Sequence, residues 1–398
     1  MNSKMQNKSF LILTFSVVIL CFGIFLHRKP RVQNKFLFSC SNQQTGLTSE
    51  NDTVYKIDLD MEKEEFIPLS SIFKRVKTII LETGIDCAIG IVSDLQVFDG
   101  CIYILDQGLA KSLFVFDMQG RFIRKIGNLG RGPGEYNIIR DFTIDAENKF
   151  IFLQDQGTLI HKYHLDGTYV HSFTIQIPSS NSYFIQSYNG RLYSSITPSK
   201  NIQTQDDYML FEIDPNDGKI ISRSLPIKLN KGWTKAIFTG NFFMSRLNNP
   251  PRYTQLFMDH VVSLDEEIST YIKLMSRYLV TERDLENLQQ TSSTNAVSTN
   301  VMGNEFEYFQ RNSKIWNVHS FIENNDFIIF NYIFGGVLNI FTVVFHKETR
   351  AVKITNNIIN DLVFNSKRNM FGLIKFSDMQ GAYEVIPTFV IDRFLEFI

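Results

Sequence analysis

A glycine-rich segment, Lys125–Tyr136 (KIGNLGRGPGEY), is the first candidate for chemistry in this sequence. Such loops cradle phosphate when Gly-Lys-Ser/Thr enters a helix, because backbone N–H groups and the helix dipole then meet the anion. This segment lacks that lysine and lies between two strand-like stretches, so the dinucleotide fingerprint fails as well. We interpret its glycines as the crossing between two sheet units, where positive φ and close backbone approach are required. Arg131, Glu135 and Tyr136 are candidates for ligand contact at its rim, although Arg131 and Glu135 could instead pair with each other.

The spacing of histidines and nucleophiles argues against a metal centre or a hydrolytic triad. His161 and His164 are three residues apart on a strand-like stretch, so they project from opposite faces and cannot bind one ion. Residues 214–218 (DPNDG) are acidic but lack the glutamate of a calcium loop at the required distance, and a hairpin turn explains them. No Gly-x-Ser-x-Gly elbow occurs. We predict no catalytic residue and no metal ligand from these patterns.

Repeated hairpins supply the elements that would position such residues. Short apolar and aromatic stretches alternate with turns, and the turns fall at Gly120, Gly167 and Gly218, near Glu266 and near Glu348. Successive turns are separated by 47, 51, 48 and 82 residues, the last step being one period plus an insertion. A period of this length with about four strands per unit is typical of a β-propeller blade.

The predicted fold is therefore all-β, a six-bladed β-propeller of four-stranded antiparallel blades over residues 54–398. Five repeats are visible, and a sixth blade would form when residues 53–59 or 77–83 pair with residues 381–391. Seven blades is the alternative count. An insertion at about 275–313 opens with a capping-box pattern, Thr281 followed by Asp284, and continues as a polar stretch. We interpret it as a surface insertion, with a lid or docking arm as the alternative.

The N-terminal region predicts a membrane tether. Residues 1–8 form a short polar n-region on the cytoplasmic side, residues 9–26 an uncharged apolar run that is a transmembrane or signal helix, and residues 27–53 a linker. Cys40, in LFSC, resembles the lipidation cysteine of a lipobox, although a basic stretch separates it from the apolar run. That basic stretch would keep the body cytoplasmic by the positive-inside rule. We nevertheless expect a membrane-anchored body facing the periplasm or the cell exterior, with a cytoplasmic sensor as a further alternative.

Composition limits the partners. Forty basic and 41 acidic residues leave a net charge of −1 with no extended run of either sign, which excludes a general nucleic-acid binder. The four cysteines are scattered; Cys87 and Cys101 could pair, but two small buried thiols are the preferred interpretation. The sequence leaves the oligomeric state open.

The stretch Ile102–Tyr136 resembles a known family, the bacterial six-bladed β-propellers, an NHL-like group of envelope-associated proteins. The shared pattern is a strand ending in Ile-Gly, then Gly-x-Gly-Pro-Gly-Glu-Tyr, here Ile126–Tyr136. Residues 79–84 and 141–155 match its opening and its second blade, and the likeness covers roughly residues 54–390. The resemblance implies a secreted or lipid-anchored protein without a generally assigned activity. The position of Cys40 departs from the family pattern.

Together these patterns predict a membrane-tethered β-propeller that acts as a binding or scaffolding module of the cell envelope. Its ligand would be a protein, peptide or glycan. The alternative is a metal-dependent hydrolase or lyase in which acids at strand ends line the propeller channel. The residues that could serve either role are Asp106, Arg140, Asp141 and Asp155, which we interpret first as turn and strand-end hydrogen bonders. No cofactor is predicted apart from the divalent metal of that alternative.

Overall fold

The computed structural model divides the chain into two compact units, each described here by itself. Unit 1 comprises Met1–Cys21, Lys77–Asn249 and Gly372–Ile398, and unit 2 comprises Phe22–Val76 and Pro250–Phe371. The structure describes residues 17–23, 54–73, 75–177, 182–196, 208–226, 243–244, 250–284, 287, 308–323, 325–336, 339–361, 366–369, 376–378 and 381–387.

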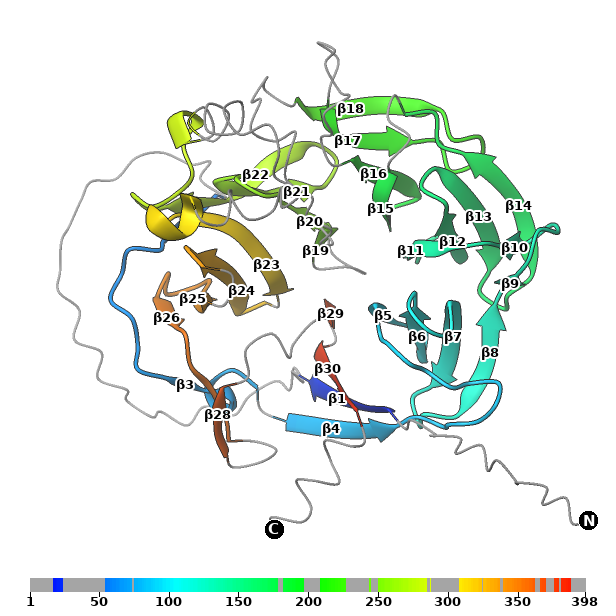
Figure 1. Ribbon diagram of the computed structural model, residues 1–398, viewed down its shortest axis with the longest axis horizontal. Helices are drawn as coiled ribbons and strands as arrows, with labels where there is room; N and C mark the ends of the chain where they lie inside the picture. The colour runs from blue at the N-terminus through cyan, green and yellow to red at the C-terminus, as the bar shows by residue number, and fades with distance from the viewer. Residues whose placement is uncertain are drawn as a thin grey trace, which may run out of the picture. The chain divides into compact units, whose positions relative to one another are not determined.

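Unit 1 contains three four-stranded antiparallel blades, each a twisted fan of strands (Figure 1). Blade 1 consists of β5 (Asp94–Phe98), β6 (Cys101–Asp106), β7 (Ser112–Asp117) and β8 (Phe122–Ile126). Blade 2 consists of β11 (Ile139–Asp145), β12 (Phe150–Asp155), β13 (Leu159–His164) and β14 (Tyr169–Thr174). Blade 3 consists of β15 (Ser182–Tyr188), β16 (Arg191–Ile196), β17 (Tyr208–Ile213) and β18 (Ile220–Pro226). Three short strands complete this part of the chain: β9 (Asn128–Leu129), β10 (Glu135–Tyr136) and β19 (Phe243–Met244).

Unit 2 contains two further blades. Blade 4 consists of β20 (Arg252–Tyr253), β21 (His260–Leu264), β22 (Ile268–Met275) and, as its outer strand, β2 (Tyr55–Asp58). Blade 5 consists of β23 (Ile315–Glu323), β24 (Phe327–Phe334), β25 (Ile340–His346) and β26 (Val352–Thr355). A small sheet is built from β3 (Ile67–Pro68), β27 (Ile358–Asn360) and β28 (Ser366–Asn369), and the 3-10 turn η1 (Leu69–Ser71) follows β3.

The described residues form five blades, and the prediction of six was wrong. The early strand expected to pair with the C-terminus, β2, instead runs parallel to β22, with Tyr55 opposite Ile272. The other early strand, β4 (Arg75–Ile80), lies in a sheet of order β29–β30–β1–β4, with β29 (Phe376–Asp378) and β30 (Gly381–Pro387). That sheet draws on three distant parts of the chain rather than on consecutive hairpins. Long-range packing decides which sheet edge an isolated strand such as β2 pairs with. The local sequence pattern does not contain that information.

The predicted N-terminal helix is not confirmed. Of residues 9–26, the structure describes Val17–Gly23, which form strand β1. Among the described residues, no helix is long and apolar enough to cross a membrane. Residues 1–16, Cys40 and the linker 27–53 lie outside the described residues.

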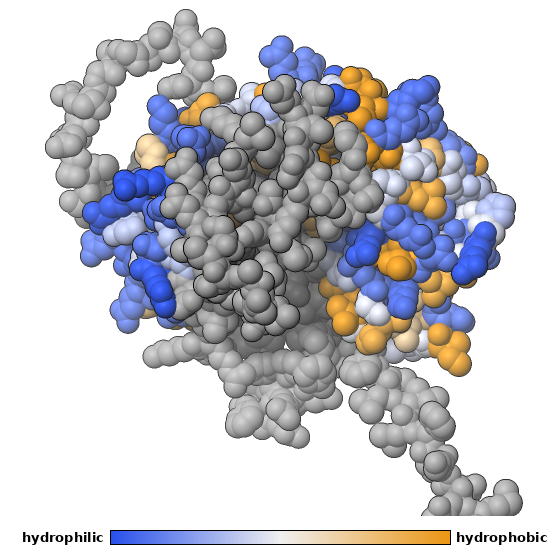
Figure 2. Space-filling view, turned by 45° about the horizontal axis from the view of Figure 1, so that its top comes forward, coloured by the Kyte–Doolittle hydropathy of each residue, from blue (hydrophilic) through white to orange (hydrophobic). Residues whose placement is uncertain are grey.

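The core lies between neighbouring blades. The middle strands are buried on both faces, which is why β6 (CIYILD) and β7 (SLFVFD) are almost continuously apolar. In the outer strand β8, more exposed side chains lie between more buried ones. One cluster joins Leu105 and Val115 of blade 1 to Phe142 and Leu153 of blade 2. This packing buries apolar faces between two blades, because a single thin sheet cannot shield both of its faces from water. Exposed apolar side chains such as Ile85, 97% exposed, also occur, and Figure 2 shows apolar and polar side chains interspersed on the described surface.

The helix start predicted in the insertion is confirmed locally. Asp284 Oδ2 accepts a hydrogen bond from the Thr281 N–H at 2.8 Å, and the Asp284 N–H donates back to Thr281 Oγ1 at 3.3 Å. Residues 282–284 are helical. Apart from residue 287, residues 285–307 of the insertion lie outside the described part, so its predicted polar loop has no structural description.

Candidate functional site

Two interfaces of unit 1 share one device, a hairpin turn that lies against the preceding strand. At both, the turn carries a glycine with positive φ, 84° at Gly120 and 77° at Gly218. The Gly120 carbonyl accepts a hydrogen bond from the Glu82 N–H at 2.7 Å, and the Gly218 carbonyl accepts one from the Gln176 N–H at 3.0 Å. A Cβ at either glycine would overlap a backbone carbonyl oxygen. Both turns therefore require glycine for two reasons, the positive φ and the lack of space for a side chain. We call this contact the turn clasp.

The turn clasp is absent between blades 1 and 2. Gly167 takes the corresponding turn position, with φ 89°, but a Cβ there would lie 3.6 Å from the Lys125 carbonyl oxygen, an ordinary contact. No described residue of β8 or of the loop after it donates a backbone hydrogen bond to Gly167. The turn is instead tethered through the Arg124 guanidinium, which donates to the Leu165 carbonyl at 3.1 Å. The Gly167 turn therefore lacks the backbone hydrogen bond of the turn clasp, and an open groove lies beside it.

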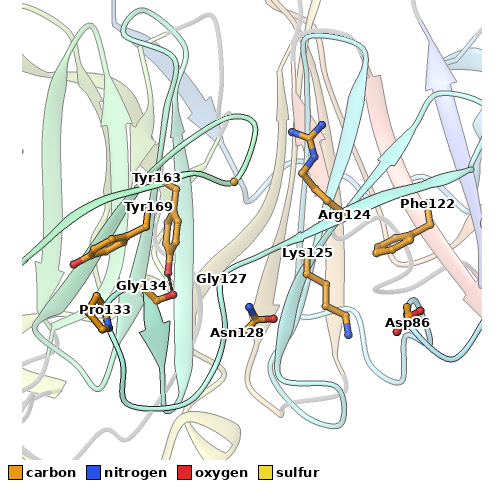
Figure 3. A pocket seen from close by; sticks show the side chains of 11 residues that line it. Asp86, Phe122, Arg124, Lys125, Gly127, Asn128, Pro133, Gly134, Tyr163 and Tyr169 are labelled. Carbon is orange, nitrogen blue, oxygen red and sulfur yellow. Dashed lines mark hydrogen bonds between the residues drawn. The ribbon is translucent and has the colours of Figure 1, made fainter.

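This groove, of about 520 Å³, is the candidate site (Figure 3). One wall comes from β8 and the residues around it, and the other from blade 2 and the end of the glycine-rich loop. The lining residues are Asp86, Phe122, Arg124, Lys125, Gly127, Asn128, Pro133, Gly134, Tyr163, Gly167 and Tyr169. In Figure 3 the Tyr169 ring and Pro133 lie on one side, and Lys125, Phe122 and Asp86 lie on the other.

The glycine-rich loop is tightly packed and connects blade 1 to blade 2, as the sequence predicted. A Cβ on Gly127 would lie 2.6 Å from the Tyr163 hydroxyl oxygen, and one on Gly134 would lie 2.8 Å from Tyr169 Cγ. Tyr163 donates its hydroxyl proton to the Gly134 carbonyl at 2.9 Å, and burial raises the pKa of this phenol above its usual range. Glu135 accepts a hydrogen bond from the Gly132 N–H at 2.7 Å. These contacts fix the groove wall before any ligand binds.

None of the six predicted ligand-binding residues lines the groove. On the loop, Arg131 is exposed, the Glu135 carboxylate accepts the Gly132 N–H, and Tyr136 is fully buried. Arg140 is exposed, and its carbonyl accepts a hydrogen bond from the Gln107 side chain. The structure thus does not gather these residues at the groove.

The predicted acids Asp106 and Asp155 occupy equivalent places at the ends of β6 and β12, and both are buried. The Asp106 carboxylate accepts hydrogen bonds at 2.7–3.1 Å from four backbone N–H groups, those of Gly90, Ile91, Gly108 and Leu109. The Asp155 carboxylate accepts two, from Asn137 at 3.0 Å and Ile138 at 2.9 Å. Asp141 accepts one from the Ile185 N–H at 2.9 Å, which links β11 to β15. Each carboxylate therefore accepts hydrogen bonds from backbone N–H groups and holds that backbone in place, which is the role that the sequence favoured.

A chain of hydrogen bonds connects Asp155 to the groove. Its Oδ2 lies 3.4 Å from His161 Nε2, His161 Nδ1 lies 2.7 Å from Ser172 Oγ, and Ser172 Oγ lies 2.8 Å from the Tyr169 hydroxyl oxygen. The chain orients the Tyr169 ring at the groove wall. Sequence reasoning missed it, because His161 meets Ser172 only through the cross-strand register of β13 and β14. The prediction that His161 and His164 lie on opposite faces is confirmed, since His161 is buried and His164 is exposed.

Among the described residues, no group of three or more His, Cys, Asp or Glu side chains could hold a metal ion. The Cys87 and Cys101 thiols are both free, as the preferred interpretation expected; Cys87 is buried, whereas Cys101 is only partly buried. What the groove offers chemically is recognition: a fixed aromatic wall, an amide, two cationic side chains and one carboxylate.

One comparison with a solved structure supports the fold. The structure is similar to the crystal structure of a "Putative exported protein (BF0058)" from Bacteroides fragilis NCTC 9343, with 17% identity and a TM-score of 0.59 over 76% of this chain and 79% of that one. A member of the duf4221 family from Bacteroides vulgatus ATCC 8482 gives 10% identity and a TM-score of 0.42 over 74% and 91%.

The predicted resemblance is confirmed at the level of a β-propeller. The six-bladed, NHL-like assignment and the glycine-rich motif are not part of what these similarities show. No curated protein matches the sequence. The model of one family, "Domain of unknown function (DUF4934)", matches residues 52–387, and the chain belongs to that family.

Proposed function

We propose that this chain is an exported β-propeller binding module of the cell envelope that holds its ligand in the groove between blades 1 and 2. The groove itself carries the proposal: it is preformed, and it lies where the repeated turn clasp is missing. Its volume is within the range of small-ligand sites, about 300–1,000 Å³. A scaffold that closes two hairpin turns of unit 1 with glycine clasps, at Gly120 and Gly218, and leaves the Gly167 turn unclasped provides a rigid receptor.

The envelope location is part of the proposal. It rests on the lipobox-like Cys40 and on the printed description of the similar Bacteroides fragilis protein as exported. The body then faces the periplasm or the cell exterior. Protease treatment of intact cells, with fractionation of wild type and Cys40→Ser, tests this arrangement. A body that resists protease in intact cells but is cut in lysed cells places it on the inner side of the outermost membrane.

The catalytic alternative has no supporting observation among the described residues. The strand-end acids that would have held a divalent metal, Asp106, Asp141 and Asp155, direct carboxylate oxygens at backbone N–H groups. Recognition without bond breaking is therefore the function that the geometry favours.

The test fills the groove by mutation. Asn128 is exposed and lines the groove, so Asn128→Trp places an indole inside it. Leu129, the next residue, is 52% exposed and does not line the groove, so Leu129→Trp is the matched control. Full-length protein is screened in detergent against oligosaccharide and peptide panels by thermal shift and calorimetry. We expect ligands whose binding Asn128→Trp weakens at least tenfold and Leu129→Trp leaves unchanged. Equal binding to both variants would show that the groove is not the site.

A further inference from the structure

We infer that one end of blades 1 and 2 is a docking surface for an acidic, aliphatic segment of a partner protein. Antiparallel pairing places the start of β5 beside the end of β6, and the start of β11 beside the end of β12. The segments at these strand ends, which we call the strand-end surface, are residues 90–93, 107–111, 137–140 and 156–158. None of them lines the groove, so this is a second site that goes beyond the proposed function.

Hydrogen bonds join the four segments to one another. In blade 1, the buried Asp106 carboxylate accepts N–H groups from both segments. In blade 2, the Gln156 N–H donates to the Ile138 carbonyl at 3.3 Å. The Gln107 side-chain amide donates to the Arg140 carbonyl and thereby connects the two blades. The strand-end surface is therefore held in place before a partner binds, which lowers the entropy cost of binding.

Three exposed aliphatic side chains lie on the strand-end surface. Ile91 is 52% exposed, Leu109 is 68% exposed and Ile138 is 46% exposed. Ile91 and Ile138 are equivalent, because the backbone N–H of each donates to the strand-end carboxylate of its own blade. The two segments of blade 1 also pack on each other, since a Cβ added at Gly108 would lie 2.9 Å from Ile91 Cδ1 and one added at Gly90 would overlap Leu109. Aliphatic side chains that are gathered and exposed in this way mark an interaction site, whereas single ones do not.

The charge of the strand-end surface is positive. Its four segments contain two cations, Lys111 and Arg140, and no Asp or Glu. Both cations are exposed, and neither forms an ion pair with a carboxylate of the described residues. The acids that border the segments are buried or half-buried and accept hydrogen bonds from groups of this chain: Asp94, Asp106, Asp141 and Asp155. Exposed cations without a local counter-charge are complementary to a partner that carries Asp or Glu.

The side chains of this surface favour a protein over a membrane. The four segments contain no Phe, Tyr or Trp. Aromatic rings are the side chains that typically anchor a protein at a lipid interface. The surface instead presents the exposed amides of Asn137 and Gln156, each of which can both donate and accept hydrogen bonds with a peptide backbone. A protein segment with Leu, Ile or Val beside Asp or Glu matches the aliphatic groups, the cations and the amides together.

A phage-displayed library of random peptides, selected against the immobilised full-length chain, tests the partner class. We expect the enriched peptides to carry aliphatic residues beside Asp or Glu. Leu109→Asp should weaken a synthetic peptide of the enriched sequence about tenfold or more, because it removes apolar contact and repels the acids. Ile221→Asp is the matched control, since Ile221 is 59% exposed on β18, outside the strand-end surface.

Charge reversal tests the cations separately. Lys111→Glu combined with Arg140→Glu should also weaken the acidic peptide about tenfold. A peptide with Lys in place of each acid should bind this double variant more tightly than it binds the wild type. Lys149→Glu is the control, because Lys149 is exposed and has a positive φ, as Lys111 does, but lies outside the strand-end surface.

Four outcomes would overturn the inference. The first is enrichment of peptides without acids, or binding that neither Leu109→Asp nor charge reversal weakens. The second is flotation with phosphatidylglycerol vesicles that Leu109→Asp abolishes, which would identify a lipid surface as the occupant. The third is binding lost in Asn128→Trp but kept in Leu109→Asp, which would place the peptide in the groove and so support the proposed function. The fourth is no enrichment at all, which leaves the proposed function to its own ligand panels.

Discussion

Replacement of Glu323 by glutamine should destabilise unit 2 strongly, because Glu323 is the single anion of a buried charge cluster. Its carboxylate meets Arg252 twice, with Nε at 2.9 Å and Nη2 at 3.2 Å, and it accepts hydrogen bonds from Lys347 at 2.6 Å and from the Tyr271 hydroxyl. The side chains of Arg252 and Glu323 are 8% and 1% exposed. The Arg252 guanidinium carbon also lies 3.5 Å from the Tyr271 ring centroid. The cluster joins blade 4 to blade 5.

The expected cost follows from that burial. Glu323→Gln keeps the size and the hydrogen-bonding oxygen but leaves Arg252 and Lys347 without a counter-charge. Removal of one partner of a buried ion pair costs about 3–5 kcal/mol, and we expect about 3 kcal/mol here because the amide oxygen still accepts a hydrogen bond. An exposed pair in unit 1 is the control: Arg191 Nε lies 3.7 Å from Glu212 Oε1, and the Arg191 side chain is 41% exposed. Glu212→Gln should cost less than about 1 kcal/mol.

Urea unfolding followed by circular dichroism measures both variants, and tryptophan fluorescence follows unit 2, since Trp316 is buried on β23, the strand that carries Glu323. The pair Arg252→Met with Glu323→Leu should recover much of the loss, because two apolar side chains leave less charge uncompensated. Burial raises the pKa of Glu323, but the hydrogen bond and charge of Arg252, together with Lys347, hold it below its usual value. Its contribution is therefore present above the unfolded pKa and lost as the pH falls. An unchanged midpoint for Glu323→Gln would refute the reasoning.

Three further predictions concern other elements. Gly120→Ala should cost at least about 1 kcal/mol more than Gly167→Ala in chemical unfolding, because both turns need positive φ but only at Gly120 would a Cβ overlap a carbonyl; equal costs would disprove the turn clasp. Burial lowers the pKa of His319 to about 4, so stability is full above about pH 6.5 and should fall by ~1–3 kcal/mol as the pH approaches 4. His319→Gln should flatten that slope, and an unchanged pH profile would contradict the assignment. Thr281→Ala should cost about 1 kcal/mol through loss of the bonds with Asp284, measured by hydrogen exchange at the insertion.

The blades were predictable because each repeat carries its own signals. Glycines at hairpin turns, unbroken apolar middle strands and alternating outer strands are local properties, and the structure shows all three at β6–β8. The partner of β2 was not predictable, since Tyr55 meets Ile272 across more than 200 residues and the alternation of YKID suits any open sheet edge. The structural role of Asp106 and Asp155 was also predictable from the sequence, because each is the last residue of the second strand of its blade.

The groove could not be found from the sequence. Gly167 has the same residue type and turn signature as Gly120 and Gly218, and only the distance of its turn from β8 distinguishes it. The glycine-rich loop resembles a phosphate-binding loop in composition. In the structure its glycines instead pack against Tyr163 and Tyr169 and form one wall of the groove. Arg124 and Lys125, the two cations of the groove lining, belong to an ordinary outer strand. The groove lies where a hydrogen bond between a turn and the neighbouring strand is missing, and a missing contact has no sequence motif.

Hydrogen–deuterium exchange of the full-length chain, with and without a ligand found in the screens, tests the central claim most directly. The account predicts that bound ligand slows exchange at residues 122–128 and 163–169, the two segments on either side of the groove, and leaves blade 5 unchanged. Protection confined to unit 2, or to the strand ends at Asp106 and Asp155, would contradict it.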